Sequence, residues 1–326
     1  MKVGKLPVDI VRKYIYNRTG AYDPAVLVGP SIGEDAAIIR SGGSFTAMHV
    51  DPISGSIGLL GWLAIHVPSN DIAVRGVRPR WAMTTIFLPP TADEGALDAI
   101  TAQMDAAARE LGVAIVGGHT EVTTAVARPL VVTSVIGVGE RYISTGGAKP
   151  GDLIIMTKSA ALEAAAILAT DFKDEMRRRG VPEEALERAA GFIRQVSAVK
   201  EALALADLAD SMHDPTEGGI LGGLVEMAYA SNASIEIDPA AVPIAEEALM
   251  LCKAAGLDPL ATLSSGALLA AVPPERLKEA ERRLGALGLR AAVIGKVAPR
   301  TSYLVKAGSL ELTEPYIRDR FFELFA

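Results

Sequence analysis

The strongest constraint on this chain is the segment 213–228, in which a carboxylate and a hydroxyl precede paired glycines. Asp214 and Thr216 supply hard oxygen ligands just before Gly218 and Gly219, and an apolar run suited to a helix follows. Oxygen ligands suit Mg²⁺, and the backbone N–H groups at a helix N-terminus suit phosphate. The segment therefore predicts a helix start that holds a metal ion and a nucleotide triphosphate, although paired glycines are also typical of an ordinary turn.

A similar arrangement occurs earlier in the chain. Residues 113–116 predict a short buried strand, which runs directly into Gly117, Gly118, His119 and Thr120. Glycines at such a position let the backbone approach a ligand closely, because no Cβ intervenes. A plain turn and a ligand-binding loop both stay open as interpretations of this segment.

Composition limits the class of protein. The chain has 326 residues, enough for two domains, and half of them are apolar, as in ordinary globular proteins. The formal net charge of −7 disfavours nucleic-acid binding, which requires a basic surface. The first ten residues contain charges and a proline instead of a signal peptide, and no uncharged run is long enough to span a membrane. We therefore expect a cytoplasmic protein with no membrane association.

Several common catalytic and nucleotide-binding motifs are missing. The sequence has no G-x-x-x-x-G-K-[ST] loop, no G-x-G-x-x-G that opens a helix, and no HExxH or Ser/His/Asp pattern. The single cysteine, Cys252, allows no disulfide or cysteine metal site within one chain. It lies in an apolar, helix-like run, so we expect a buried thiol rather than a nucleophile.

Apolar patterning alternates between strands and helices along the whole chain. In the first half it predicts strands at 35–40, 45–50, 81–88, 113–116 and 130–138, and helices at 58–76, interrupted at Pro68, and at 96–111. In the second half it predicts strands at 153–157, 234–237, 267–272, 291–297 and 303–305, and helices at 160–169, 171–188 (broken at 180–182), 192–208, 219–229, 246–255 and 274–287. Glycines and a proline within 146–152 mark the best boundary. We expect two mixed α/β domains, 1–148 and 149–326.

Four carboxylates lie where predicted strands end or helices begin. Asp35 and Asp51 flank two apolar strands, Asp71 follows Asn70 late in a helix, and Asp214 precedes the second glycine pair. Each one alone is typical of a solvated turn or a helix cap. Mg²⁺, however, usually binds through a few carboxylates together with substrate phosphates. The set therefore predicts that acidic side chains from both halves of the chain meet around one divalent cation.

Five segments, in this order, resemble the aminoimidazole ribonucleotide (AIR) synthetase-related, or PurM-like, superfamily. They are residues 33–37 (Gly-Glu-Asp-Ala-Ala), 50–51 (Val-Asp), 70–73 (Asn-Asp-Ile-Ala), 117–120 (Gly-Gly-His-Thr) and 214–219 (Asp-Pro-Thr-Glu-Gly-Gly). The resemblance covers roughly residues 30–300. The group includes thiamine-monophosphate kinase, selenophosphate synthetase and the hydrogenase maturation factor HypE. Residues 256–260 and 265–266 look most like HypE and its archaeal-type relatives.

This resemblance implies a fold and a set of site residues. The N-terminal domain would be α/β, with strands that form a dimeric β-barrel, and the C-terminal domain would be α+β. A homodimer would hold ATP and Mg²⁺ in a cleft between the domains, where an oxygen of a small-molecule substrate is activated. By the same resemblance, the implied magnesium ligands are Asp35, Asp51, Asp71 and Asp214. The implied nucleotide-binding residues are Asn70, Gly117, Gly118, Thr120, Thr216, Gly218 and Gly219, and the implied catalytic residues are Asp51, Asp214 and His119.

Two positions depart from the family pattern. Thiamine-monophosphate kinases and HypE carry Asp where this chain has His119. Imidazole is a poor ligand for hard Mg²⁺, so we expect His119 to contact phosphate instead. HypE ends in a cysteine that receives a carbamoyl group, whereas this sequence ends in Phe325 and Ala326. The reactive Cys or selenocysteine of selenophosphate synthetase is also missing, and the N-terminal glycine-rich loop is not obvious.

Three hypotheses of function follow. The first is an ATP- and Mg²⁺-dependent enzyme that transfers phosphate to, or activates, an oxygen of a small molecule. The second is a HypE-like maturation factor that dehydrates a carbamoyl group presented by a partner protein. The third is an accessory protein that binds ATP and does no chemistry. The sequence names no substrate pocket.

Overall fold

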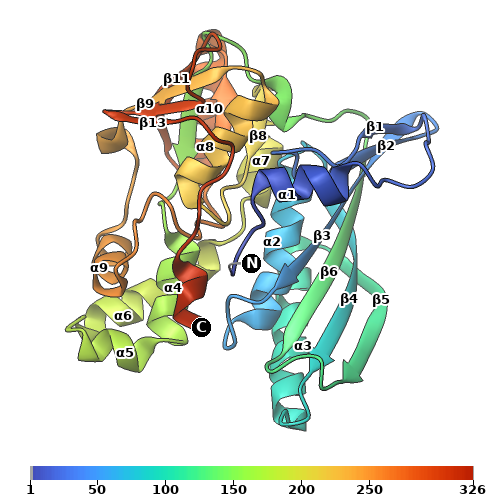
Figure 1. Cartoon of the computed structure of the whole chain (residues 1–326), viewed down its shortest axis with the longest axis vertical. Helices are drawn as coiled ribbons and strands as arrows, with labels where there is room; N and C mark the ends of the chain where they lie inside the picture. Colours follow the sequence, from blue (N-terminus) through green and yellow to red (C-terminus); the bar gives the residue numbers. More distant parts are fainter. Residues whose placement is uncertain (1–2, 326) are drawn as a thin grey trace.

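The computed structural model describes residues 3–325 and has two parts, each built on its own β-sheet (Figure 1). The first sheet has six strands in the order β1-β2-β3-β6-β4-β5, and the second has seven in the order β13-β12-β9-β11-β7-β10-β8. β4 pairs with β5 in parallel, and so does β9 with β12. Every strand up to β6 belongs to the first sheet and every later strand to the second, so each half of the chain forms a mixed α/β unit.

The first half is a sheet with helices packed on one face. Its elements are α1 (Val8–Val11), a π-helical turn (Arg12–Tyr16), β1 (Val26–Val28), β2 (Ala37–Ser41), β3 (Ser44–Ile53), α2 (Leu60–Ala73), β4 (Pro79–Leu88), α3 (Glu94–Leu111), β5 (Ala114–Val122) and β6 (Leu130–Gly139). β2 and β3 form the predicted hairpin. β4, α3 and β5 form a strand–helix–strand unit. α2 packs on β3 and β6, with α3 beside it.

The opposite face of the first sheet is open. Along β4 the side chains alternate: Ala82 and Ile86 are buried beneath the helices, whereas Met83 is 51% exposed. Met48 and Val50 of β3 are exposed as well. One half of the β4 side chains therefore belongs to the core of the single chain, and the other half lies on the open face.

The dimeric β-barrel implied by the family resemblance is not present in the single chain. The six strands form an open sheet, with β1 at one edge and β5 at the other. A closed barrel would need these edges to be paired, either with each other or with a second copy. Within residues 3–325 the correct description is an open mixed sheet.

The second half surrounds its sheet with more helices. Its elements are β7 (Leu153–Thr157), α4 (Leu162–Thr170), α5 (Lys173–Arg178), α6 (Glu183–Ala190), α7 (Val199–Leu205), β8 (Ser211–His213), α8 (Gly219–Ala230), β9 (Ser234–Ile237), α9 (Glu246–Ala255), β10 (Leu269–Val272), α10 (Leu277–Ala286), β11 (Ala291–Ala298), β12 (Val305–Ala307) and β13 (Leu310–Leu312). Short 3₁₀ turns lie at Thr145–Gly147, Gly191–Gln195, Pro239–Ala241, Pro274–Arg276 and Phe321–Phe325. The predicted boundary at 148/149 lies in the connection between β6 and β7.

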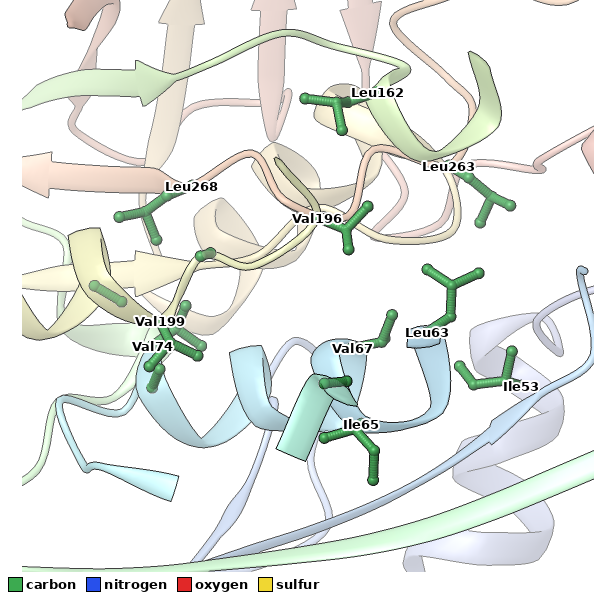
Figure 2. Packing of buried hydrophobic residues seen from close by; sticks show 14 of the residues in the cluster. Ile53, Leu63, Ile65, Val67, Val74, Leu162, Val196, Val199, Leu263 and Leu268 are labelled. Atoms are coloured by element: carbon green, nitrogen blue, oxygen red, sulfur yellow. The ribbon is translucent and has the colours of Figure 1, made fainter. Parts of the chain in front are cut away.

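Helix α2 joins the two halves. Of its residues, all but Trp62 are buried, because one side packs on the first sheet and the other on the second half of the chain. Such double burial explains why apolar residues lie on more than one side of the helix. Figure 2 shows the packing at this junction, where side chains of the first half (Ile53, Leu63, Val67, Val74) face those of the second (Leu162, Val196, Val199, Leu263, Leu268), and Ile65 points to the other side of α2. None of the helices in residues 3–325 is long and apolar enough to cross a membrane.

Three local expectations were wrong. Pro68 does not interrupt α2, since the helix continues through it to Ala73. The helix predicted at 192–208 is split into a 3₁₀ turn and α7, because residues 196–198 leave the helix to pack on α2. The strand predicted at 113–116 continues to Val122, so the first glycine pair lies within a strand and not in a loop.

Candidate functional site

A first cluster of polar side chains lies between β3 and α2. His49 and Asp51 are on the helix-facing side of β3, and Asp71 reaches them from the last turn of α2. His49 Nε2 is 3.6 Å from Asp51 Oδ1 and 3.5 Å from Asp71 Oδ2. Burial lowers the pKa of His49, but the neighbouring carboxylates, first of all Asp51, raise it above its usual value. The protonated form of His49 is therefore favoured by the negative charge around it.

A second cluster brings residues of both halves together. Asp35 comes from the segment before β2, and His213 and Asp214 come from the end of β8. His213 Nδ1 lies 2.6 Å from Asp35 Oδ1, and His213 Nε2 lies 2.9 Å from Glu226 Oε2 on α8. Burial lowers the pKa of His213, but Asp35 and Glu226 raise it to about 10. The imidazolium therefore holds these two carboxylates in place.

Both clusters line one cavity of about 290 Å³, named here the acidic cavity. Its acidic and histidine side chains include Asp35, His49, Asp51, Asp71, His213 and Asp214. The predicted convergence of carboxylates from the two halves is confirmed by this arrangement. The assignment of these four aspartates as magnesium ligands stays a prediction.

Two of these carboxylates lack hydrogen-bond partners. Asp71 is 6% exposed and Asp214 is 1% exposed, yet Asp71 Oδ2 and both carboxylate oxygens of Asp214 accept no hydrogen bond from any described residue. Burial, together with the other carboxylates, raises the pKa of both groups well above the usual value. Buried charges are normally paired or coordinate metals, so these oxygens fit a bound cation.

Other charges near the cavity are already compensated. Arg75 is fully buried, and its guanidinium donates to Glu34 Oε2 at 2.7 Å, to Asp35 Oδ2 at 2.8 Å and to the carbonyl of Met212 at 2.7 Å. Arg75 and His213 therefore neutralise Asp35, whereas His49 is the cation shared by Asp51 and Asp71, and the set of Asp51, Asp71 and Asp214 keeps an excess of carboxylates.

Lys5, from the N-terminal segment, also lines the acidic cavity and belongs to neither of the two clusters. Its Nζ lies 3.2 Å from Glu226 Oε1, and its backbone N–H donates to Glu217 Oε2 at 2.8 Å. Burial raises the pKa of Glu226, but Lys5 and His213 lower it to about 2. This segment thus covers part of the acidic cavity and is fixed to the second half of the chain.

Asn70 has a structural role in the described chain. Its side-chain NH₂ donates to the carbonyl of Val196 at 2.9 Å, and its Oδ1 accepts from the N–H of Ala198 at 2.8 Å. The side chain is fully buried and joins α2 to the segment before α7. It does not line the acidic cavity, whereas Thr216 does. Nucleotide contact by either residue stays a prediction.

The second glycine pair begins α8 as predicted, but its N–H groups are not free. Gly218 donates to Asp319 Oδ2 at 3.2 Å, and Gly219 donates to the carbonyl of Thr216 at 3.0 Å. Both glycines have positive φ, and a Cβ on Gly219 would lie 2.6 Å from the carbonyl oxygen of Thr262. The expectation of exposed N–H groups at this helix start was wrong, because turn geometry and close packing account for the glycines.

The first glycine pair lies far from the acidic cavity within one chain. Gly117, Gly118, His119 and Thr120 belong to the edge strand β5, three strands from β3, which corresponds to about 14 Å. A Cβ on Gly118 would lie 1.9 Å from the carbonyl oxygen of Thr84 on β4, where the register shifts. Close strand pairing therefore explains this glycine. Within one chain these residues therefore do not meet the carboxylates, and nucleotide contact by Gly117, Gly118 and Thr120 and a catalytic role of His119 stay predictions.

Five residues of the site were missed by the sequence reasoning: Lys5, Glu34, His49, Arg75 and Glu226. Arg75 lies in the turn after α2, which ends at Ala73, so helical spacing from Asp71 does not predict its place in the site. Glu226 lies on the helix that Gly219 begins. No sequence signal connects Lys5 to α8, because their contact is made only by the fold.

Two parts of one protein family match the two halves of the chain. The C-terminal domain of the AIR synthase related proteins matches residues 149–306, and the N-terminal domain matches residues 33–139. The matched segments contain one sheet each, apart from β1 and the last hairpin.

Individual relatives cover most of the chain. A carbamoyl dehydratase HypE of Rhizobium leguminosarum bv. viciae is 30% identical over 79% of this chain and 73% of its own length. A candidate hydrogenase expression/formation protein of Methanocaldococcus jannaschii is 28% identical over 98% of this chain and 94% of its own. A selenide, water dikinase of Citrifermentans bemidjiense is 30% identical over 87% of this chain and 89% of its own.

A solved structure agrees with these relatives. Hydrogenase maturation protein HypE in complex with ATP superposes with a TM-score of 0.65 at 27% identity and covers 87% of this chain and 80% of that chain. Both halves of the present chain are thus matched in sequence and in fold. The chain therefore belongs to the AIR synthase related protein family.

Proposed function

We propose that this protein binds ATP with Mg²⁺ at the acidic cavity and transfers the γ-phosphoryl group to an oxygen atom of a small-molecule substrate. The observation that carries the proposal is the buried pair Asp71 and Asp214, in which Asp71 Oδ2 and both oxygens of Asp214 accept no hydrogen bond from any described residue. Magnesium binds through a few carboxylates plus substrate phosphates, and such ions supply electrostatic stabilisation in phosphoryl transfer. The relatives support this, since a selenide, water dikinase and a HypE solved with ATP are among them.

The metal ligands would divide into two kinds. Asp51, Asp71 and Asp214 would bind Mg²⁺ directly, since His49 is the single cation that faces Asp51 and Asp71 among the described residues of the first cluster. Asp35 is held by Arg75 and by His213, so it would contribute mainly charge and position. Asp51 and Asp214 would act as the catalytic carboxylates, because the ion that they hold neutralises the phosphates as the bond to the leaving group breaks.

The nucleoside would lie on the neighbouring surface of the first sheet. A hollow with a largely apolar lining adjoins the acidic cavity and shares Glu34, Asp35 and His49 with it; Met48, Val50 and Ile136 form part of its wall. An apolar wall beside a triphosphate-binding acidic cluster suits an adenine ring.

We infer that a second copy of the chain covers the open face of the first sheet. Every residue of β5 is exposed, and the exposed apolar side chains on this sheet include Met48, Val50, Met83, Ile115, Val116 and Val122. An unpaired edge next to an apolar face favours pairing with another strand. A homodimer closed in this way would form the barrel and would let Gly117, Gly118, His119 and Thr120 approach the nucleotide of the partner.

A second candidate function is the HypE-like one, in which ATP activates the oxygen of a carbamoyl group carried by a partner protein. The observation that favours it is the similarity to carbamoyl dehydratase HypE over 79% of the chain. The same cavity chemistry would serve, because phosphate again goes to an oxygen. The two functions differ in what presents the oxygen, a free small molecule or a carbamoylated cysteine of another chain.

The experiment is ADP release by the purified protein with Mg²⁺ and a panel of acceptors, including a carbamoyl-cysteine peptide. Asp51→Asn and Asp214→Asn should each lower the rate by roughly 10²–10³, the usual effect of losing one electrostatic donor. Asp98→Asn, an exposed change on α3, serves as the matched control. Wild-type rates in both site variants would remove the metal model. ATP binding without ADP release for any acceptor would instead favour an accessory role.

A further inference from the structure

A second, smaller cavity lies beside the acidic cavity, where the end of β3 meets the second half of the chain. Its volume is about 90 Å³, and it shares Lys5, Asp51 and Thr216 with the acidic cavity. Its apolar wall is formed by Ile53, Val67, Leu263 and Phe322. The small cavity is therefore adjacent to the proposed metal ligands and is shielded by both halves of the chain.

Two polar groups in the wall of the small cavity face each other and have no other partner. Glu163 comes from the first turn of α4 and is 6% exposed, and Ser265 comes from the segment before β10 and is 1% exposed. Apart from the contact between them, neither Glu163 Oε2 nor Ser265 Oγ makes a hydrogen bond with a described residue. A buried polar atom without a partner costs about 1–3 kcal/mol, so a ligand that pairs with these atoms is favoured.

The backbone around these groups is fixed. The N–H of Ala164 donates to the carbonyl of Leu263 at 3.1 Å, and the N–H of Ala161 donates to Ser264 Oγ at 2.8 Å. These bonds tie the start of α4 to the segment that carries Ser265. Glu163 and Ser265 are thus held side by side in the wall, as a preorganised pair of hydrogen-bonding groups.

We propose that the small cavity is the acceptor subsite, that it takes a small uncharged group bearing an N–H or O–H, such as an amide or alcohol, and that Glu163 accepts the proton of that group. The proposal rests on the proposed function above. Asp51, Glu163 and Glu217 surround the cavity with carboxylates, and among residues 3–325 Lys5 is the one ammonium in its wall. An anionic acceptor, such as a phosphate ester or selenide, would be repelled by this charge.

The chemistry balances without a further reactant. The acceptor oxygen forms a bond to the γ-phosphorus, the bond from this phosphorus to the β,γ-bridging oxygen breaks, and ADP leaves with the electron pair. The proton of the acceptor O–H, or of the N–H of an amide that reacts through its oxygen, goes to Glu163. Burial raises the pKa of Glu163 to about 7, and the neighbouring Ser265 offsets only part of this effect. A base with a pKa near neutrality is suited to this transfer.

The test compares Glu163→Gln and Ser265→Ala with Glu187→Gln, an exposed change on α6. Acetamide is the uncharged probe and inorganic phosphate the anionic one. Saturation-transfer NMR should show acetamide, but not phosphate, binding to the wild-type protein, and Glu163→Gln should weaken this binding at least tenfold. With acetamide present, Glu163→Gln should lower ADP release by roughly 10²–10⁴, the usual contribution of a general base. Ser265→Ala should weaken acetamide binding and leave the thermal unfolding temperature within a few degrees.

The outcomes separate this proposal from the proposed function. If Asp214→Asn abolishes ADP release but Glu163→Gln changes neither release nor acetamide binding, the subsite is wrong and the metal site stands. Phosphate binding that is stronger than acetamide binding would overturn the acceptor class. If neither Asp214→Asn nor Glu163→Gln lowers ADP release, the proposed function itself is wrong. Binding of Mg²⁺ and ATP, measured by calorimetry, should be unchanged in Glu163→Gln.

Discussion

Replacement of Asp214 by Asn should stabilise the metal-free protein. Asp214 is 1% exposed, and one of its oxygens lies within 4.8 Å of ligand atoms of Asp35 and His213. Two unit charges at that distance repel by ~3.5 kcal/mol at an effective dielectric constant of 20. Arg75 and His213 compensate part of the charge on Asp35, and protonation relieves more of the repulsion. We therefore expect a gain of about 1–3 kcal/mol in the free energy of unfolding, or about 2–4 °C in Tm for each kcal/mol.

Magnesium should reverse this order of stability. A ligand that binds only the folded state stabilises it by about 2.7 kcal/mol at one hundred times its Kd. The wild-type protein should gain this stabilisation, whereas Asp214→Asn has lost a ligand and should gain little. The variant is thus expected to be the more stable protein in chelator and the less stable one in saturating Mg²⁺ with a non-hydrolysable ATP analogue.

Calorimetric melting of both proteins in EDTA and across a Mg²⁺ titration is the assay. Asp98→Asn makes the same change of charge on the exposed surface of α3 and should follow the wild-type protein in both conditions. The reasoning would be refuted if Asp214→Asn were less stable than the wild type in EDTA while Mg²⁺ stabilised both equally. That pattern would mean that Asp214 is already satisfied within the fold.

Three further predictions concern residues around the site. Gly219→Ala should destabilise the protein by about 1–3 kcal/mol, since φ at this residue is +61° and the new Cβ would clash with the backbone. Its control is Gly285→Ala, at a position of α10 with open space around it, which should stabilise the protein by up to about 1 kcal/mol. Thermal melts compare the two variants. Asn70→Ala should cost about 1–3 kcal/mol for each backbone group left unpaired, and should leave ATP affinity by calorimetry nearly unchanged if the amide is purely structural. Without Mg²⁺, the free energy of unfolding should fall as pH rises from the usual aspartate pKa toward the raised pKa of Asp71 and Asp214. The reason is that the folded protein keeps protons that the unfolded chain has already released. Saturating Mg²⁺ should flatten this dependence, which melts at about pH 5 and about pH 7.5 measure.

The convergence of the four aspartates could be predicted because each lies at the end of an element. Asp51 is near the end of a strand, Asp71 is in the last turn of the helix that packs on that strand, and Asp214 directly follows β8. Ends of packed elements meet at few places in a two-layer fold. Residue type, position and the family resemblance together were therefore enough to place these side chains at one cavity.

The glycine pairs could not be interpreted correctly without the fold. A glycine is equally suited to a ligand loop, to a left-handed turn and to the close approach of another backbone. Gly118 has no room for a Cβ because of Thr84 on the next strand, and Gly219 because of Thr262, which follows it by 43 positions in the chain. Such non-local contacts leave no trace in the local sequence pattern. The sequence gives no sign of a functional role for Glu163 for a related reason. This residue lies in an alanine-rich segment whose pattern predicts only a buried helix.

The charges around the acidic cavity divide into a structural group and a group left for a ligand. Arg75 pairs with Glu34 and Asp35, and His213 pairs with Asp35 and Glu226, so each of these cations has its full set of carboxylates within 3 Å. A buried ion pair contributes little net stability, but removal of one partner costs about 3–5 kcal/mol. Arg75 and His213 therefore cannot pair with Asp71 or Asp214 without leaving another carboxylate unpaired. The carboxylates that these two cations do not pair with are fixed in position by the fold, and under the proposed function a divalent cation, which prefers oxygen ligands, would balance their charge.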